Sequence, residues 1–183
     1  MQLIKFVNFT HLGKSDLIRI LEKRNSDEIR SKMVNRAPIP LESHLKFCEH
    51  LKKDNSKLYF AIYVDSVLAG VADFQNINYE NHTYEPGIYF VNDNSIIRSH
   101  ITVALLQVRL HYRLYNPVIR VRKDNLQALI FNTMKMGAKV EREDDEFYYL
   151  SGSRINVNNE KELGVVYWDL AQLEKKYILQ YEY

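Results

Sequence analysis

The sequence predicts an α+β fold in which helices flank one central, mixed sheet. Short runs rich in Val, Ile, Tyr and Phe recur through the first half of the chain at the length of strands. A long amphipathic helix is expected near the middle, and strands and helices alternate between residues 85 and 150. With 183 residues, 46% of them hydrophobic, the chain is long enough for one sizeable core and too short for two.

The N-terminal part of the chain predicts one strand followed by three helical stretches. Residues 3–9 read as the strand, and Ser15-Asp16 is expected to cap the first helix. A shorter helical stretch over residues 27–33 is broken by the two prolines of residues 37–40. Helical spacing then returns at Leu41, Leu45, Cys48 and Leu51.

Three strands follow these helices. Residues 57–64 and 67–75 predict a hairpin that turns at Asp65-Ser66, because both runs are rich in β-branched and aromatic residues. A polar turn over residues 78–83 separates this hairpin from a third strand, residues 84–91.

Residues 95–115 predict a long helix with two faces. The apolar face is made by Ile97, Ile101, Ala104, Leu105, Val108, Tyr112 and Tyr115. The other face is made by Arg98, Thr102, Arg109 and Arg113.

The last third of the chain predicts a strand, a helix and further strands. The short strand covers residues 117–123, and the second helix runs over residues 125–136 to Gly137. The later strand candidates are residues 138–143, 147–157 and 164–170. We expect a single domain over residues 1–172 and a polar, helical or flexible tail over residues 173–183.

Composition excludes several classes of protein. No run of 18 apolar residues exists, and the start of the chain lacks the pattern of a signal peptide. Cys48 is the only cysteine, so no internal disulfide and no cysteine-based metal site is expected. These absences favour a cytoplasmic protein without membrane contact, and the net charge of +2 does not favour a nucleic-acid partner.

Charge is nevertheless uneven along the chain. Between Asp93 and Asp124 there is no acidic residue, while five arginines and Lys123 fall in that window. Residues 141–146 then carry five acids and one arginine, which is typical of a solvated face. The basic window coincides with the segment that would face a phosphorylated ligand.

The order and spacing of several short matches give the chain a family resemblance. They are Arg24-Asn25, Ile29, Met33, His44, Phe47, Tyr59-Phe60, Gly70, Asp73-Phe74, Glu85-x-Gly87-x-Tyr89 and Asn125-x-x-Ala128 with Gly137. On these residues the chain resembles the GNAT superfamily of N-acetyltransferases. Within it, the chain is most similar to the nucleotide-sugar N-acetyltransferases of bacterial glycan biosynthesis, in particular the pseudaminic-acid branch, which acetylates the 4-amino group of a UDP-linked sugar. The resemblance implies a mostly antiparallel sheet with splayed middle strands and about four flanking helices.

The resemblance also implies a site for acetyl-CoA as acyl donor. The backbone of Tyr89, Phe90 and Val91 would pair with the pantetheine arm, and Asn125 and Asn132 would lie beside it on the second helix. The family's glycine-rich pyrophosphate loop is absent here, and Arg98, Ser99 and His100 at the start of the long helix would supply charge and hydrogen bonds instead. Two alternatives stay open: Ile96 and Ile97 block the site, or the three polar residues only solvate the helix start.

The resemblance implies Glu85 as the general base, with Asp73, Glu80 and His82 as fallbacks. A structural or exposed role for Glu85 is the alternative. The tyrosine that usually protonates the leaving thiolate is missing, because the equivalent position is Asn132 or Thr133. Tyr148 or Tyr149 is the substitute that the sequence offers.

Arg24, Asn25, Met33 and Phe74 are the implied acceptor-binding residues. Capping of the first helix is the alternative for Arg24-Asn25, and helix packing is the alternative for His44, Phe47 and Cys48. The partners implied are an acyl-CoA and an amino sugar nucleotide, and the tyrosine-rich tail could dock on the second subunit of a homodimer.

The sequence therefore predicts an N-acetyltransferase that works by direct attack of an amine on the thioester. The alternative is a degenerate member of the fold that binds or assembles without catalysis, as the lost glycines and the missing tyrosine would suggest. Nucleic-acid binding through the basic window is the weakest of the three hypotheses, since much of that window is apolar helix and strand.

Overall fold

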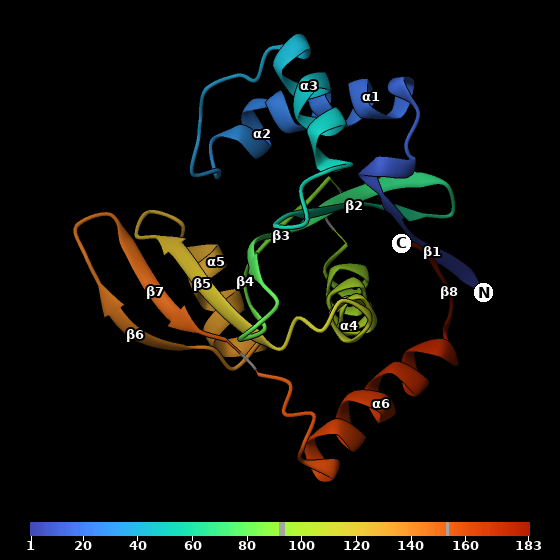
Figure 1. Cartoon of the computed structure of the whole chain (residues 1–183), viewed down its shortest axis with the longest axis vertical. Helices are drawn as coiled ribbons and strands as arrows, with labels where there is room; N and C mark the ends of the chain where they lie inside the picture. Colours follow the sequence, from blue (N-terminus) through green and yellow to red (C-terminus); the bar gives the residue numbers. More distant parts are fainter. Residues whose placement is uncertain (92–93, 153) are drawn as a thin grey trace.

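The computed structural model describes residues 1–91, 94–152 and 154–183, and it contains one eight-stranded sheet in the order β6-β7-β5-β4-β3-β2-β1-β8 (Figure 1). The strands are β1 (Gln2–Asn8), β2 (Leu58–Val64), β3 (Val67–Asn78), β4 (Thr83–Phe90), β5 (Asn116–Arg122), β6 (Lys139–Glu143), β7 (Phe147–Ser151) and β8 (Tyr177–Glu182). The α-helices are α1 (Lys14–Asn25), α2 (Asp27–Arg30), α3 (Leu41–Leu51), α4 (Ser95–His111), α5 (Leu126–Ile130) and α6 (Glu160–Glu174). The predicted α+β class with a mostly antiparallel sheet is confirmed. Within the described residues, no helix is long and apolar enough to cross a membrane.

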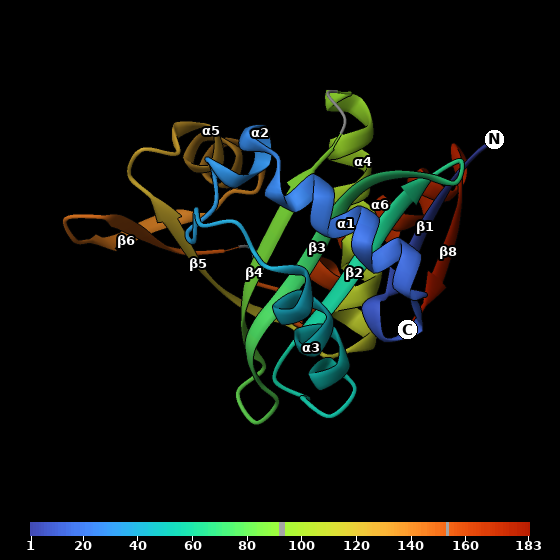
Figure 2. The same cartoon turned by 90° about the horizontal axis from the view of Figure 1, so that it is seen from above.

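The two faces of the sheet carry different helices. Helices α1 and α3 cover one face and α4 covers the other, as both views show (Figures 1 and 2). The cluster under α4 is the larger one and is built around Phe6, Phe60, Ile101 and Val108, all fully buried. A second cluster under α1 and α3 contains Ile20 and Cys48. Each strand in the middle of the sheet therefore has one face toward α4 and one toward α1 and α3.

The predicted hairpin between β2 and β3 is confirmed. Asp65 and Ser66 both have positive φ angles, 48° and 69°, which suit a tight two-residue turn. The Asp65 carboxylate accepts a hydrogen bond of 2.8 Å from the Leu3 N–H, so the turn is fixed to the start of β1.

Strands β4 and β5 are parallel and pair only where they begin. The paired residues are Thr83 with Asn116 and Tyr84 with Pro117. Beyond these pairs the two strands diverge (Figure 1). The predicted splay of the middle strands is confirmed, and it leaves one backbone edge of β4 unpaired by any described strand.

The C-terminal region corrects two sequence predictions. Residues 164–170 are not a strand but part of α6, although Val165, Tyr167 and Trp168 have high β propensity. The helix forms instead for two reasons. The Asn159 side chain caps it by accepting hydrogen bonds from Lys161 N and Glu162 N, and Leu170 and Leu173 are buried at helical spacing.

The residues after α6 are not a helical or flexible tail. They form β8, which pairs in parallel with β1 at the edge of the sheet. Tyr177, Leu179, Tyr181 and Tyr183 alternate along this strand and pack into the core beneath α4. The Tyr181 ring stacks on Phe6 at 5.2 Å, and its hydroxyl donates to the Ala104 carbonyl.

Several predicted details also differ in the structure. Gly13, not Ser15-Asp16, is the N-cap of α1, and no side chain caps it. Arg109 does not lie on a polar face of α4 but is buried, and its guanidinium donates to the carbonyls of Leu114 and Tyr115. The predicted helix over residues 125–136 is a short α5 followed by a wider π turn, and the strand predicted for residues 147–157 ends at Ser151.

Candidate active site

The unpaired edge of β4 is the backbone feature that could receive an extended ligand. The Val91 N–H donates to the Ala69 carbonyl of β3 at 2.8 Å, and Tyr89 lies opposite Val71. Because backbone groups alternate in direction along a strand, this register turns Tyr89 and Val91 toward β3 and turns Ile88 and Phe90 toward the open edge. Of the three residues predicted to pair with pantetheine, only Phe90 presents its backbone there, and Ile88 was missed.

The start of α4 lies next to this edge, but its N–H groups are already used. The Asn94 side chain accepts hydrogen bonds of 3.1 Å from both Ile96 N and Ile97 N. A helix N-terminus whose donors are capped in this way has less to offer an anion. The Arg98 guanidinium lies over the Phe90 ring at 5.4 Å from its centre, which places a cation at the open edge of β4.

The other two residues predicted to hold pyrophosphate are engaged elsewhere. The Ser99 hydroxyl donates back to the Ser95 carbonyl at 3.0 Å. The His100 ring lies 2.8 Å from the Tyr177 hydroxyl, on the side of α4 that faces β8, where burial lowers the pKa of His100. The structure therefore does not bring His100 to Arg98.

The side chains of α5 and the turn after it, which the resemblance assigns to the cofactor, are also engaged in local hydrogen bonds. Asn125 is the N-cap of α5, with its side-chain oxygen 3.1 Å from Ala128 N and its amide donating to the Lys32 carbonyl. The Asn132 amide donates to the Ala128 carbonyl, and the Thr133 hydroxyl donates to the Leu129 carbonyl. The substitute Tyr149 lies in the β6–β7 hairpin, where its hydroxyl donates to Asp144. None of these groups supplies the missing acid beside β4.

The face of the sheet beneath α1 and α3 carries the acidic groups. Glu85 and Gly87 of β4 lie opposite Gln75 and Asp73 of β3, so both carboxylates share this face next to Gly87. Glu85 accepts a hydrogen bond of 2.9 Å from the Asn76 amide. Asp73 accepts one of 2.6 Å from the Gln75 amide, and burial raises the pKa of Asp73 to about 6. Both carboxylates are partly buried and lie beside a glycine, so either of them could act as the general base.

The remaining fallback bases lie away from this face. Glu80 is exposed in the turn between β3 and β4. His82 is in the same turn, with its ring nitrogen 3.1 Å from the Arg113 carbonyl. Both residues are fallback bases that the resemblance implies, but the structure groups neither of them with Gly87.

Arg24 and Asn25 fix the segment between α2 and α3. Asn25 exchanges two hydrogen bonds of 2.9 Å with the backbone of Ile39, and the Arg24 Nη2 donates to the Asn35 carbonyl at 2.7 Å. Arg24 Nη1 is buried without a hydrogen-bond partner among the described residues, and burial is the main cause that lowers the pKa of this guanidinium. Met33 lies in the same segment, whose Arg36 forms an ion pair with Asp124 beside α5.

Two of the predicted contacts are packing residues. Phe74 is 3% exposed and lies in the core beneath α4, against Phe60 and Tyr84, so it is not on the face that carries Arg24. This part of the prediction is wrong, because residues of β3 alternate between the faces and Phe74 follows Asp73 directly. His44 is buried with its ring nitrogen 3.0 Å from the Leu17 carbonyl, so the packing alternative describes it.

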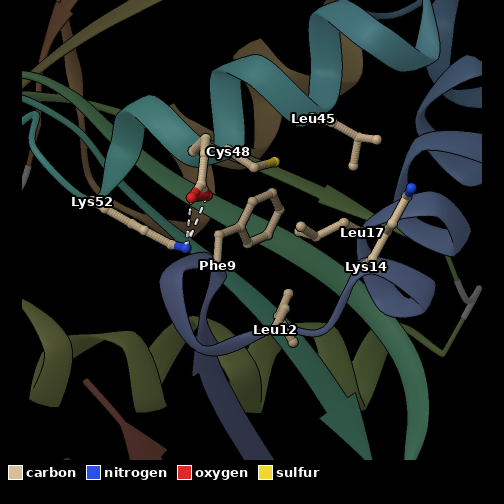
Figure 3. A pocket seen from close by; sticks show the side chains of 8 residues that line it. Phe9, Leu12, Lys14, Leu17, Leu45, Cys48 and Lys52 are labelled. Carbon is tan, nitrogen blue, oxygen red and sulfur yellow. Dashed lines mark hydrogen bonds and ion pairs between the residues drawn. The ribbon is translucent and has the colours of Figure 1, made fainter.

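A pocket of about 340 Å³ lies between α3, α1 and the end of β1 (Figure 3). Its walls are mainly apolar, with Phe9, Leu17 and Leu45 pointing toward one another and Lys14 and Lys52 nearer the rim. Cys48 lines it, and burial raises the pKa of this thiol to about 11, which keeps it protonated and unreactive. The pocket is lined by none of the residues of β4, so it is not the predicted acyl site.

The raised pKa of Asp73 has a consequence for stability. A folded-state pKa of about 6, above the value near 4 of an unfolded aspartate, means that the folded protein binds the proton more tightly. Stability is therefore lost as pH rises from about 4 to about 6, by up to roughly 3 kcal/mol. We expect Asp73→Asn to raise the free energy of unfolding at pH 8 and to leave it unchanged at pH 4, as measured by urea denaturation. Equal effects at both pH values would contradict this.

Comparison with known proteins supports the predicted resemblance. No protein-family model matches the chain. The acetyltransferase PseH of Campylobacter jejuni serotype O:2 is 26% identical over 160 residues, which cover 81% of this chain and 92% of the relative. PseH of serotype O:23/36 is 28% identical over 156 residues, with the same coverage.

Solved structures give the same result. The C. jejuni N-acetyltransferase PseH in complex with acetyl coenzyme A matches with a TM-score of 0.63 and 28% identity, over 81% of this chain and 97% of that one. The spermidine N-acetyltransferase of Vibrio cholerae in complex with CoA and spermine matches with a TM-score of 0.67 over 81% of this chain and 92% of that one, but at 17% identity it supports the fold alone. The predicted resemblance to GNAT acetyltransferases, the fold and the enzyme class are therefore confirmed.

Proposed function

We propose that this acetyltransferase uses acetyl-CoA to acetylate the amino group of a nucleotide-linked amino sugar. The observation that supports this proposal most is the arrangement of β4. The strand has an open backbone edge at Ile88 and Phe90, and the face that holds Gly87 also carries the Glu85 carboxylate. The similarity to PseH, of which one solved structure contains acetyl coenzyme A, supports the donor. The amino sugar nucleotide is the finer part of the proposal and rests on the resemblance to the pseudaminic-acid branch.

The residues fit the donor in part. An extended amide chain can hydrogen-bond to the unpaired backbone groups of Ile88 and Phe90 as an added strand would. Arg98, over Phe90, offers the charge for a phosphate group at the same edge. The capped start of α4 does not offer the free N–H groups that a pyrophosphate usually takes, so Arg98 carries more of this binding than a residue in a glycine-rich loop would.

The donor supplies the thioester. Transfer then requires the amine of the acceptor to be neutral and to lie next to this thioester. Glu85 is the proposed base, because it lies on β4 two residues before Gly87 and on the same face of the sheet. It could take the amine's proton directly or through a water. Arg24 is the proposed contact of the acceptor, since its Nη1 is buried and no described residue pairs with it. Asn25 and Met33 would act with it by shaping the segment between α2 and α3.

The function is tested by incubating the protein with acetyl-CoA and a UDP-linked 4-amino-4,6-dideoxy sugar, and measuring free CoA thiol and the acetylated product. We expect stoichiometric formation of both. Spermidine, the substrate named for a structural neighbour, is the competing acceptor. Transfer to spermidine but not to the sugar would replace the proposed acceptor, and binding of acetyl-CoA without transfer to either would favour the non-catalytic alternative.

Arg98→Ala is expected to weaken acetyl-CoA binding by about 10- to 100-fold, the usual loss for a hydrogen bond to a charged group. Isothermal titration calorimetry measures the effect. Arg19→Ala is the matched control, because Arg19 is exposed on α1 and contacts only Asp16, at 3.7 Å, among the ion pairs of the described residues. An unchanged affinity in Arg98→Ala would place the pyrophosphate elsewhere.

A further inference from the structure

Asp73 is a partly buried carboxylate that no cation in the described part of the chain neutralises. It lies in the middle of β3, between Tyr59 of β2 and Gly87 of β4, on the face beneath α1 and α3. Its Oδ1 accepts from the Gln75 amide at 2.6 Å, and no donor among the described residues pairs with Oδ2. A carboxylate in the middle of a sheet that no cation of the described residues neutralises, with one oxygen left to accept, can bind a cationic ligand.

Gly87 has no side chain and therefore leaves room for the Asp73 carboxyl group. A Cβ atom at Gly87 would lie 2.7 Å from Asp73 Oδ1 and 2.8 Å from Asp73 Cγ, closer than real Cβ contacts come. The side chain of Asp73 therefore lies across the backbone of β4 at Gly87. This position is one residue from Ile88, where the open edge of β4 begins.

The neighbouring groups leave the charge of Asp73 unbalanced. Tyr59 and Tyr89 are the titratable side chains next to it, and burial raises the pKa of both, so they remain neutral. Glu85 is acidic and is occupied by the Asn76 amide. The charge of Arg24 acts on the pKa of Tyr89, and no ion pair among the described residues joins Arg24 to Asp73.

We propose that Asp73 binds the ammonium group of the acceptor and holds it over Gly87, beside the open edge of β4. The inference rests on the proposed function and deepens it, because it assigns the recognition of the amine to β3 while deprotonation stays with Glu85. A primary amine is charged at neutral pH, and its acetamide is not. The same carboxylate therefore binds the substrate strongly and has no charge to bind in the product, which favours product release.

The first test compares Asp73→Asn with the unchanged protein, using the UDP-linked 4-amino-4,6-dideoxy sugar, its N-acetylated product and acetyl-CoA as ligands. We expect the affinity for the amine to fall by about tenfold or more, and the affinities for product and acetyl-CoA to stay within about twofold. Asp16→Asn, in the exposed first turn of α1, is the control and should change none of them. Equal losses for amine and product would indicate a structural role and overturn the proposal, as would no loss at all.

A second test does not depend on the acceptor. The carboxyl carbon of Asp73 is followed by NMR on protein labelled at aspartate, with the signal assigned by its absence in Asp73→Asn. Ethylamine should lower the apparent pKa of Asp73, because a bound ammonium favours the carboxylate. A pKa that ethylamine does not move would overturn the proposal even if transfer is observed. A lowered pKa in a protein that does not bind acetyl-CoA would retain the amine site and reject the proposed function.

Discussion

Gly87→Ala should reduce acetyl transfer by at least about 100-fold while the protein stays folded. The added methyl group would overlap the Asp73 carboxyl group, so either that side chain or the backbone of β4 must move. A displacement of about 1 Å between reacting groups is enough for a loss of this size. The measurement is kcat/KM for the amino sugar nucleotide, with thermal unfolding to confirm the fold.

Gly164→Ala is the matched control for this substitution. Gly164 lies in α6, and a Cβ atom there would meet nothing within 4 Å. The change should leave transfer unaltered and stabilise the helix by about 0.5–1 kcal/mol. Full activity in Gly87→Ala would contradict the placement of the reacting amine over this glycine.

Tyr181→Ala should lower the free energy of unfolding by about 3 kcal/mol, the cost of removing an aromatic ring from a core. The ring of Tyr181 stacks on the fully buried Phe6, and its hydroxyl bonds to the backbone of α4 at 3.0 Å. Urea denaturation followed by circular dichroism measures the loss.

Ile178→Ala provides the comparison, because Ile178 lies on the same strand and is 54% exposed. It should cost less than about 1 kcal/mol. Equal and small effects of the two substitutions would mean that the C-terminal residues are a dispensable tail, as the sequence suggested, and not the strand β8.

The first two-thirds of the fold could be predicted from the sequence because local signals agree with the packing there. The β2–β3 hairpin has its apolar strands and its Asp65-Ser66 turn, and the stripe of Leu17, Ile20 and Leu21 is buried as its spacing predicts. At the C-terminus local and tertiary signals conflict. Val165, Tyr167 and Trp168 favour a strand by propensity, whereas the Asn159 cap and the burial of Leu173 select a helix.

The strand β8 was missed for a related reason. Alternation of apolar and polar side chains is present only over residues 179–182, because Ile178 breaks it at the start of the strand. The polar residues around this short segment obscured the pattern. Its stability comes from pairing with β1, which lies at the opposite end of the sequence and could not be inferred locally.

Only the positions of the candidate residues can be compared with the sequence prediction. Glu85, named as the base, and Gly87, named in the family match, lie on one face of the sheet with Asp73, which had been named only as a fallback. Phe74 and His100 were misplaced, because a motif match gives the position in the sequence but not the direction of the side chain. The capping of α4 by Asn94 follows a local signal, an asparagine directly before the helix, that was overlooked. The environment of the Arg24 Nη1 depends on three-dimensional contacts that no spacing reveals.

Calorimetric titration of the protein with acetyl-CoA is the decisive measurement for donor binding. We expect micromolar binding that is weakened in Arg98→Ala and unchanged in Arg19→Ala, because Arg98 is the cation at the open edge of β4. No binding at millimolar acetyl-CoA would contradict the proposed function, and the fold would then serve a purpose other than acetyl transfer.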